Sequence, residues 1–257
     1  MKAEAIFFGH GSPMNAITDN EFAKEWKRIG KSLTKPKAIL CISAHYETNG
    51  TYITANEHPP TIHDFGGFPK ELFAVQYPAP GDPKLVNTIL ERIPEIYADL
   101  EWGLDHGTWS VLRHVFPYAD IPILQLSLDR NKSPKEHFEF AKSLGYLRDE
   151  GVLIVGSGNL VHNLRLVAWD KMNEPEFFYD WAEDANKTLK EWILSENIKF
   201  LSEPFSHGDS LKKAIPTLEH FLPALYILGV KTPADSIQFF NDKPVMGSLS
   251  MTSFRVN

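Results

Sequence analysis

Short runs of consecutive apolar residues alternate along this chain with segments in which apolar residues recur every three or four positions. The runs Ala5–Phe8, Ala38–Ser43 and Val152–Val155 are typical of strands that are buried on both faces. The segments Asn20–Leu33 and Phe177–Leu194 have the helical spacing. Because strands and helices alternate in this way, the pattern predicts a central sheet of mostly parallel strands with helices on its faces.

Weaker patterns complete the expected elements. Further strands are expected at Thr51–Thr54, Ile121–Leu128, Ile237–Phe240 and Ser248–Phe254, and further helices at Pro83–Ile93, Ser110–Phe116, Ser133–Leu147 and Thr217–Leu228. Glu57–Pro83 is rich in proline and glycine, and long irregular segments of this kind often line binding sites. We predict a single α/β domain over residues 1–257, with a mixed, mostly parallel sheet flanked by helices and an active site at the carboxyl ends of the strands.

Three of the apolar strands lead to a histidine. His10 and His45 follow the first two strands closely, and His162 follows the strand that ends at Val155. His220 lies in the first turn of the helix expected at Thr217–Leu228. Neutral imidazole is a common ligand of zinc, iron, copper and nickel. A single histidine at a strand end is more often solvated, but its repetition makes these four residues candidate ligands of one metal ion.

Other polar residues leave more than one interpretation open. Glycines flank His10, and we expect them to clear space for an ion and its substrate. Two histidines, His63 and His106, lie in the loops expected to roof the same edge. Surface positions are expected for His58, His114, His137 and His207. Three carboxylates complete a metal site or cap a turn: Asp64, Asp105 and Glu219.

Composition narrows the function classes. The formal net charge of −7 gives no electrostatic footprint for nucleic acid. No apolar stretch has the length of a membrane span. The single cysteine, Cys41, excludes an intrachain disulfide and a cysteine-based metal cluster. The first residues lack the layout of a secretory signal, so we expect a cytoplasmic protein.

Eight motifs spread over nearly the whole chain resemble one known family. They are GHGSPMN (9–15), SAHY (43–46), PPTIHDFGGFP (59–69), YPAPG (77–81), DHGTW (105–109), SGNLVHNL (157–164), PTLEHFLPALYILG (216–229) and GSLSM (247–251). Together and in this order they resemble the DOPA-type class III extradiol ring-cleavage dioxygenases. The resemblance implies an enzyme that uses O2 to open the ring of an aromatic diol, DOPA or a similar catechol, to a muconic semialdehyde.

The resemblance also implies roles for particular residues. One divalent ion, Zn2+ or Fe2+, would be held by His10, His45 and His220, with His162 as a further ligand or as the acid/base beside the metal. The remaining implied residues are His106 as a second catalytic residue, and His63, Tyr46 and Phe65 as substrate contacts. The wider class III group uses two histidines and a glutamate, but here the family pattern favours His220 over Glu219. A zinc hydrolase or a catalytically silent metal-binding protein on the same scaffold is the alternative.

Overall fold

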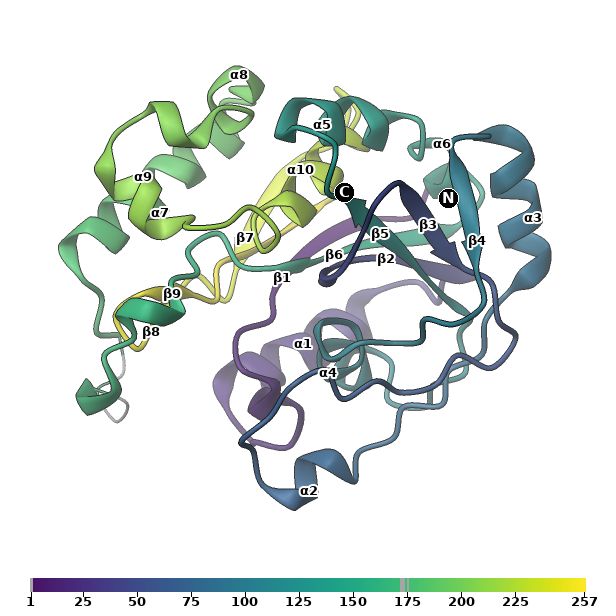
Figure 1. Ribbon diagram of the computed structural model, residues 1–257, viewed down its shortest axis with the longest axis horizontal. Coiled ribbons are helices and arrows are strands. Elements are labelled where there is room, and N and C mark those ends of the chain that lie inside the picture. Colours follow the sequence, from purple (N-terminus) through teal and green to yellow (C-terminus); the bar gives the residue numbers. More distant parts are fainter. Residues whose placement is uncertain (1, 172–173, 175) are drawn as a thin grey trace.

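An eight-stranded sheet forms the centre of the computed structural model, which describes residues 2–171, 174 and 176–257 (Figure 1). Its strands lie in the order β4-β3-β5-β2-β6-β1-β10-β7. Their bounds are β1 Ala5–Gly9, β2 Ala38–Thr48, β3 Thr51–Thr54, β4 Ile96–Asp99, β5 Ile123–Asp129, β6 Val152–Gly158, β7 Ile237–Phe240 and β10 Ser253–Val256. The neighbours β5, β2, β6 and β1 are parallel to one another. Strand β10 is antiparallel to both of its neighbours, β1 and β7, and β3 is antiparallel to β5 but parallel to β4. The predicted mixed, mostly parallel sheet is confirmed.

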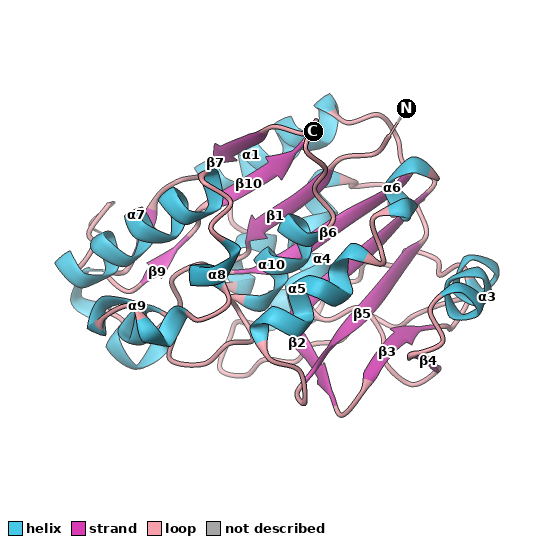
Figure 2. Ribbon diagram, turned by 90° about the horizontal axis from the view of Figure 1, so that it is seen from above, coloured by secondary structure: helices cyan, strands magenta, loops and turns pink. Residues whose placement is uncertain are grey.

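Helices cover both faces of this sheet. The helices are α1 Glu21–Ser32, α2 Lys70–Phe73, α3 Pro83–Arg92, α4 His106–Val115, α5 Pro134–Lys142, α6 Tyr146–Asp149, α7 Asp180–Leu194, α8 Ile198–Leu201, α9 Asp209–Ala214 and α10 Leu222–Gly229. Helices α1 and α4 pack together below the sheet in Figure 1, and α5 and α10 lie above it. Helices α7 and α9 lie beside this second pair, toward the β7 end of the sheet (Figure 2).

The side chains of β1 show how one strand supplies two cores. Ala5 and Phe7 belong to the apolar cluster between the sheet and helices α5 and α10, whereas Ile6 and Phe8 belong to the cluster between the sheet and helices α1 and α4. Successive residues of a strand point to opposite faces, so a strand between two helical layers must be apolar throughout. This arrangement explains the unbroken apolar run in the sequence.

Two elements that carry predicted site residues differ from expectation at their ends. Strand β2 continues beyond Ser43 to Thr48, so His45 lies inside the strand, where the pairing with β5 shifts register. Helix α4 begins at His106 instead of Ser110, because the Asp105 side chain accepts a hydrogen bond from the Thr108 N–H and caps the helix. Gly107 lies inside this first turn, and the glycine is the reason that the sequence pattern favoured a loop up to Trp109.

The helix predicted at Thr217–Leu228 starts later, so the placement of His220 in its first turn is wrong. Helix α10 begins at Leu222, with Pro223 in its first turn. Proline lacks an N–H and its ring clashes with the carbonyl four residues earlier, so it fits only the first turn of a helix. His220 therefore lies in the turn before α10.

Smaller differences concern short elements. Strand β4 and helices α2, α8 and α9 were not predicted, and the expected helix at Ser133–Leu147 is divided into α5 and α6. The expected strand at Ser248–Phe254 is also divided, because Leu249–Ser250 (β9) pairs with Pro244–Val245 (β8) and only β10 joins the main sheet. No helix among the described residues combines the length and apolarity that crossing a membrane requires.

His137 is a correction to the predicted surface histidines. Its side chain is fully buried in α5, and Nδ1 lies 2.9 Å from the hydroxyl oxygen of Tyr226 in α10. Burial lowers the pKa of His137 to about 4, so the imidazole is neutral at pH 7. His58 is exposed as expected, and His114 and His207 are half-buried.

The buried side chain of Arg148 in α6 connects the two ends of the chain, because it donates to the Ala3 and Val256 carbonyls and pairs with Asp235. The Arg148 guanidinium is 1% exposed, and its Nη1 donates to Asp235 at 2.7 Å and to the Val230 carbonyl. Replacing Arg148 by Met should lower the free energy of unfolding by about 2–3 kcal/mol, because the Asp235 carboxylate then loses one of its two cationic partners and keeps only Lys2. Urea unfolding measures this. The exposed pair Arg28–Glu25 is the control, and Arg28→Met should cost less than about 1 kcal/mol.

The difference in stability between wild type and Arg148→Met should depend on pH. Burial by itself raises the pKa of Asp235, but hydrogen bonds from Arg148, Thr232 and Lys2 outweigh it and hold that pKa well below its ordinary value. The resulting stabilisation is complete above the unfolded pKa of about 3.9 and is lost as pH falls below it. The difference in stability between wild type and Arg148→Met should therefore shrink below about pH 4. A constant difference down to pH 2 would contradict this assignment.

Candidate metal centre and active site

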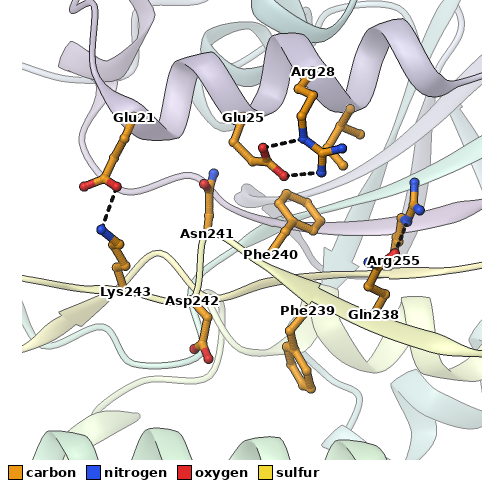
Figure 3. Close-up of a pocket in the computed structure, with 11 residues that line it drawn as sticks. Glu21, Glu25, Arg28, Gln238, Phe239, Phe240, Asn241, Asp242, Lys243 and Arg255 are labelled. Atoms are coloured by element: carbon orange, nitrogen blue, oxygen red, sulfur yellow. Dashed lines mark hydrogen bonds and ion pairs between the residues drawn. The ribbon is translucent and has the colours of Figure 1, made fainter.

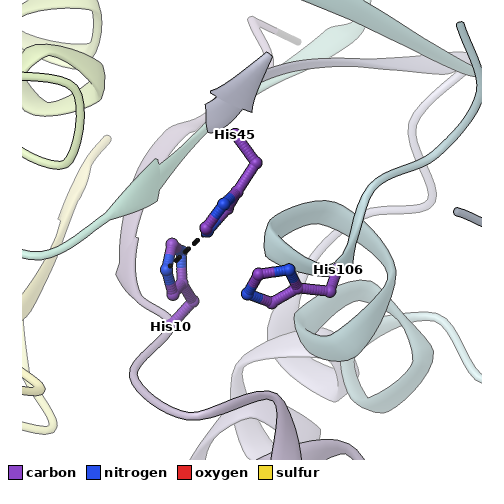
Figure 4. A group of neighbouring side chains, drawn as sticks. All are labelled: His10, His45 and His106. Carbon is purple, nitrogen blue, oxygen red and sulfur yellow. Dashed lines mark hydrogen bonds between the residues drawn. The ribbon is translucent and has the colours of Figure 1, made fainter. Parts of the chain in front are cut away.

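Five histidines gather at the carboxyl edge of the parallel strands. His10 follows β1, His45 lies in β2, His106 opens α4, His162 follows β6 and His220 precedes α10. Figure 4 shows three of these rings turned toward one another from separate elements. The structure thus brings the four predicted ligands and His106 to one place, as the carboxyl-edge rule for open α/β sheets predicts.

Three of the rings form a nearly regular triangle. The ring centroids are 5.1 Å apart for His10 and His45, 5.3 Å for His10 and His220, and 5.1 Å for His45 and His220. The Nε2 atoms of His10 and His45 are 3.3 Å apart. Two ligands at 2.0–2.1 Å from a tetrahedral ion would be separated by about 3.3–3.4 Å. The spacing therefore suits two imidazoles that share one metal ion.

The other two histidines each cover a ring of this triangle. The ring of His106 lies 3.9 Å from that of His45, and His162 stacks on His220 at 3.5 Å with an interplanar angle of 11°. The ligand nitrogens of His10, His45 and His106 also lie within 4.8 Å of one another. A second group of ligand atoms within this distance comes from His162, Glu219 and His220. His10 and His45 are thus joined by His220 when ring positions are compared and by His106 when ligand-atom distances are compared.

Hydrogen bonding defines which nitrogen of His10 is free. The Ser157 hydroxyl donates its one proton to the Gly107 carbonyl at 2.6 Å. It must then accept from Nδ1 of His10, which lies 3.0 Å away. The proton of His10 therefore sits on Nδ1, and the lone pair of Nε2 faces His45. A bond from the second ring nitrogen is the usual means of orienting a histidine ligand.

His220 is oriented in a similar way by its neighbour. Its Nδ1 lies 3.0 Å from a carboxylate oxygen of Glu219, and that oxygen also accepts a bond from the Thr217 hydroxyl at 2.8 Å. An ionised carboxylate only accepts, so Nδ1 of His220 carries the proton and Nε2 keeps its lone pair. Glu219 thus has the position of an orienting carboxylate.

A further carboxylate stands between His45 and His106. The two oxygens of Asp64 lie 3.4 Å from Nδ1 of His45 and 2.9 Å from Nδ1 of His106. Asp64 also accepts the backbone N–H of His106 at 2.9 Å. It therefore fastens the irregular segment 57–83 to the start of α4.

Burial keeps four of the five imidazoles uncharged. Desolvation, followed by repulsion between neighbouring imidazoles, lowers the pKa of His10 and of His220 well below 6.5. The pKa of His45 falls to about 3 and that of His162 to about 4, in both cases mainly through burial. All four imidazoles are neutral at pH 7, which is the state that binds metals.

The glycines around His10 serve packing. A Cβ on Gly9 would lie 2.7 Å from the Met251 carbonyl carbon, and a Cβ on Gly11 would lie 2.4 Å from the Met251 sulfur. Gly11 also has a φ of +60°, a conformation that side chains disfavour. Met251 thus gives a reason for these glycines that differs from the expected one, space for an ion and its substrate.

The predicted substrate contacts do not all lie together. The ring of Phe65 lies 5.5 Å from that of His106, edge to face. His63 lies one ring further out, 5.8 Å from Phe65, with Nε2 3.0 Å from the Val75 carbonyl oxygen. Phe65 therefore borders the histidine cluster directly, whereas His63 supports Phe65 from behind.

Tyr46 is packed away from the cluster. Its partners are Asp99 and Trp102, which are not among the five histidines. Its ring stacks on Trp102 at 4.9 Å and its hydroxyl donates to Asp99. Its role as a substrate contact stays a prediction, and among the described residues its aromatic partner is Trp102.

A separate hollow of about 470 Å³ lies between α1 and β7 (Figure 3). Its acidic side chains are largely paired, Glu25 with Arg28 and Glu21 with Lys243. The described residues that line it include no histidine. This hollow is therefore separate from the candidate metal centre.

The chain belongs to the aromatic ring-opening dioxygenases: the family model described as "Catalytic LigB subunit of aromatic ring-opening dioxygenase" matches residues 5–230. It is 44% identical to the 4,5-DOPA dioxygenase extradiol of Escherichia coli K12, over 98% of this chain and 94% of that protein. It is 32% identical to the protein of the same name from Beta vulgaris, over 98% of this chain and 96% of the other. The resemblance to extradiol dioxygenases is thereby confirmed.

A solved structure agrees with this membership. The crystal structure of the uncharacterized protein JW3007 from Escherichia coli K12 matches with a TM-score of 0.86 and 38% sequence identity, and the match covers 100% of both chains. The structural match thus also includes the residues after 230, which the family model does not match.

Ser157 gives a test of the orientation of His10. Ser157→Ala should weaken Zn2+ binding about 10–100-fold, because Nδ1 of His10 loses its partner. Isothermal titration with Zn2+ measures the affinity. Ser110→Ala is the matched control, since the Ser110 hydroxyl is equally buried but has no hydrogen-bond partner among the described residues. Equal affinities for the two variants would contradict the assigned role.

Proposed function

We propose that this protein is a metal-dependent extradiol dioxygenase that opens the ring of a catechol, DOPA or a similar diol, with O2 to a muconic semialdehyde. The observation that carries the proposal is the triangle formed by His10, His45 and His220 at the carboxyl edge of the sheet. The family to which the chain belongs consists of aromatic ring-opening dioxygenases. We further expect it to act in the cytoplasm.

One divalent ion would be held by the Nε2 atoms of His10 and His220, whose Nδ1 protons are occupied, together with His45. Neutral nitrogen donors suit both Fe2+ and Zn2+. When bound, Fe2+ would favour deprotonation of the diol and allow electrons to pass from the ring to O2.

His162 is the proposed acid/base of the chain. It stacks on His220 and is neutral at pH 7, so its imidazole is able to take a proton from a catechol hydroxyl and later return it. His106, on the other side of the cluster, would hydrogen-bond substrate or oxygen. Phe65, edge-on to His106, would supply an apolar wall for the aromatic ring.

A zinc hydrolase is the competing function, because three imidazoles with an open position are also the ligand set of zinc enzymes that activate water. A silent metal-binding protein would keep the same ligands without turnover. The two alternatives differ from the dioxygenase in their need for oxygen.

An oxygen-uptake assay separates these functions. Protein loaded with Fe2+ without air should consume O2 when DOPA is added, and it should form a visibly absorbing ring-opened product with one O2 consumed per product. Zn2+-loaded protein without oxygen is the control for hydrolysis of ester and amide substrates. No O2 uptake with DOPA or with simpler catechols would overturn the proposal.

Single alanine variants decide whether His220 or His106 is the third metal ligand beside His10 and His45. His220→Ala should abolish tight metal binding. His162→Ala should keep the metal and lose turnover by about 10²–10⁴-fold, as expected for a proton-transfer group. His106→Ala should also keep the metal and lose turnover by about 10²–10³-fold, as expected for a hydrogen-bond donor to the reacting oxygen. Metal content by elemental analysis and kcat by O2 uptake measure these effects. Loss of metal in His106→Ala with retention in His220→Ala would instead assign the site to His10, His45 and His106.

A further inference from the structure

The segment of β2 that carries His45 is not held by the regular ladder to β5. The pairing runs in register to Ile42 and resumes at Glu47, so on the β5 side residues 43–46 lie opposite Ser127 alone, and the ladder to β6 ends at Ser43. Bulges of this kind often lie beside active sites, where they redirect a side chain. Something other than the ladder to β5 must therefore set the position of His45 relative to its neighbours.

The fully buried carboxylate of Asp105 supplies this contact. Oδ1 of Asp105 accepts the Ser43 hydroxyl at 2.7 Å, and the Ser43 oxygen in turn accepts the backbone N–H of His45 at 3.2 Å. Asp105 and Ser43 are both 0% exposed. The backbone of His45 is thus linked to Asp105 through one serine hydroxyl.

The same carboxylate starts helix α4. Asp105 accepts the Thr108 N–H at 3.1 Å as the N-cap, and His106 is the next residue. The helix approaches β2 so closely that a Cβ on Gly107 would lie 2.5 Å from the Ser43 oxygen and 2.9 Å from Cδ2 of His45. One side chain therefore touches both segments that deliver His45 and His106.

Gln125 of β5 completes the unit. Its amide nitrogen donates to Oδ2 of Asp105 at 2.6 Å, and its amide oxygen accepts the Asp105 backbone N–H at 2.9 Å. Each bond to the carboxylate comes from a donor, so the pattern requires two acceptor oxygens at position 105. An amide at that position would face the Gln125 amide donor to donor.

We propose that Asp105 is a positioning residue, which locks the irregular part of β2 to the first turn of α4 and thereby sets the contact between His45 and His106. This proposal rests on the proposed function only for the roles of His45 and His106 in metal binding and turnover. Asp105 itself touches neither imidazole through a hydrogen bond. It acts through Ser43 and through the helix that it caps.

An exchange of polarity tests the proposal. Asp105→Asn should lower Zn2+ affinity about 10–100-fold, the usual effect of losing an orienting partner, and should lower kcat with it. Asp105→Asn combined with Gln125→Glu restores an acceptor opposite the new amide, and it should recover most of both losses. Gln125→Glu alone places two carboxylates together and should be the most impaired. A swap that recovers neither loss would overturn the proposal.

A readout without metal separates this inference from the proposed function. In metal-free protein labelled with 15N-histidine, the ring-nitrogen shifts of His45 and His106 should change in Asp105→Asn and return in the double variant. Unchanged shifts in a folded Asp105→Asn variant would overturn the positioning role even if the enzyme is a dioxygenase. If wild type shows no metal binding and no O2 uptake, the proposed function fails and the shifts still decide this inference.

Milder substitutions cover the case in which Asp105→Asn fails to fold. Ser43→Ala removes only the link to His45, and it should lower Zn2+ affinity. Ser110→Ala is the matched control, because the Ser110 hydroxyl is equally buried and has no hydrogen-bond partner among the described residues. It should leave affinity unchanged. Equal affinities for Ser43→Ala and Ser110→Ala would overturn the proposal.

Discussion

The close approach of the turn before α10 to strand β6 is the contact on which the rest of the site depends. A Cβ on Gly158 would lie 2.1 Å from the His220 carbonyl oxygen, and a Cβ on Gly156 would lie 2.6 Å from that of Pro223. Two residues without side chains therefore let the turn rest on the strand, where the Asn159 N–H donates to the His220 carbonyl at 2.8 Å. Without this approach, the third corner of the histidine triangle would be displaced by more than the tolerance of a metal site.

Orientation is a second requirement, and polar groups from distant parts of the chain meet it. The hydroxyl of Ser157 links His10 to the Gly107 carbonyl at the start of α4. The carboxylate of Glu219 accepts a hydrogen bond from the imidazole of His220. These bonds leave nitrogen lone pairs directed into a buried space where burial keeps the rings neutral. The protein is thus prepared for a cation, because its imidazoles need not release protons at neutral pH.

The sheet and the meeting of the histidines could be predicted because buried parallel strands leave long apolar runs and deliver their ends to one edge. Features that depend on partners far along the chain could not. The course of β2 beyond Ser43 involves a hydrogen bond to Asp105, 62 residues later in the chain. Tyr46 was grouped with its neighbour in a motif, but its ring packs on Trp102, also far along the chain. The start of α10 is a different case, because the local signal of Pro223 was outweighed by the apolar pattern over Thr217–Leu228. His137 was expected at the surface, because only its pairing with Tyr226 shows that α10 covers it.

The three corners of the triangle come from residues 10, 45 and 220, so an ion held there would join the first strand of the chain to its last third. Such a cross-link closes long loops, and an ion that binds only the folded state adds its binding free energy to folding. Folding and metal acquisition would then be one equilibrium. The fraction of intact protein in a cell would follow the supply of free metal as well as the strength of the apolar core.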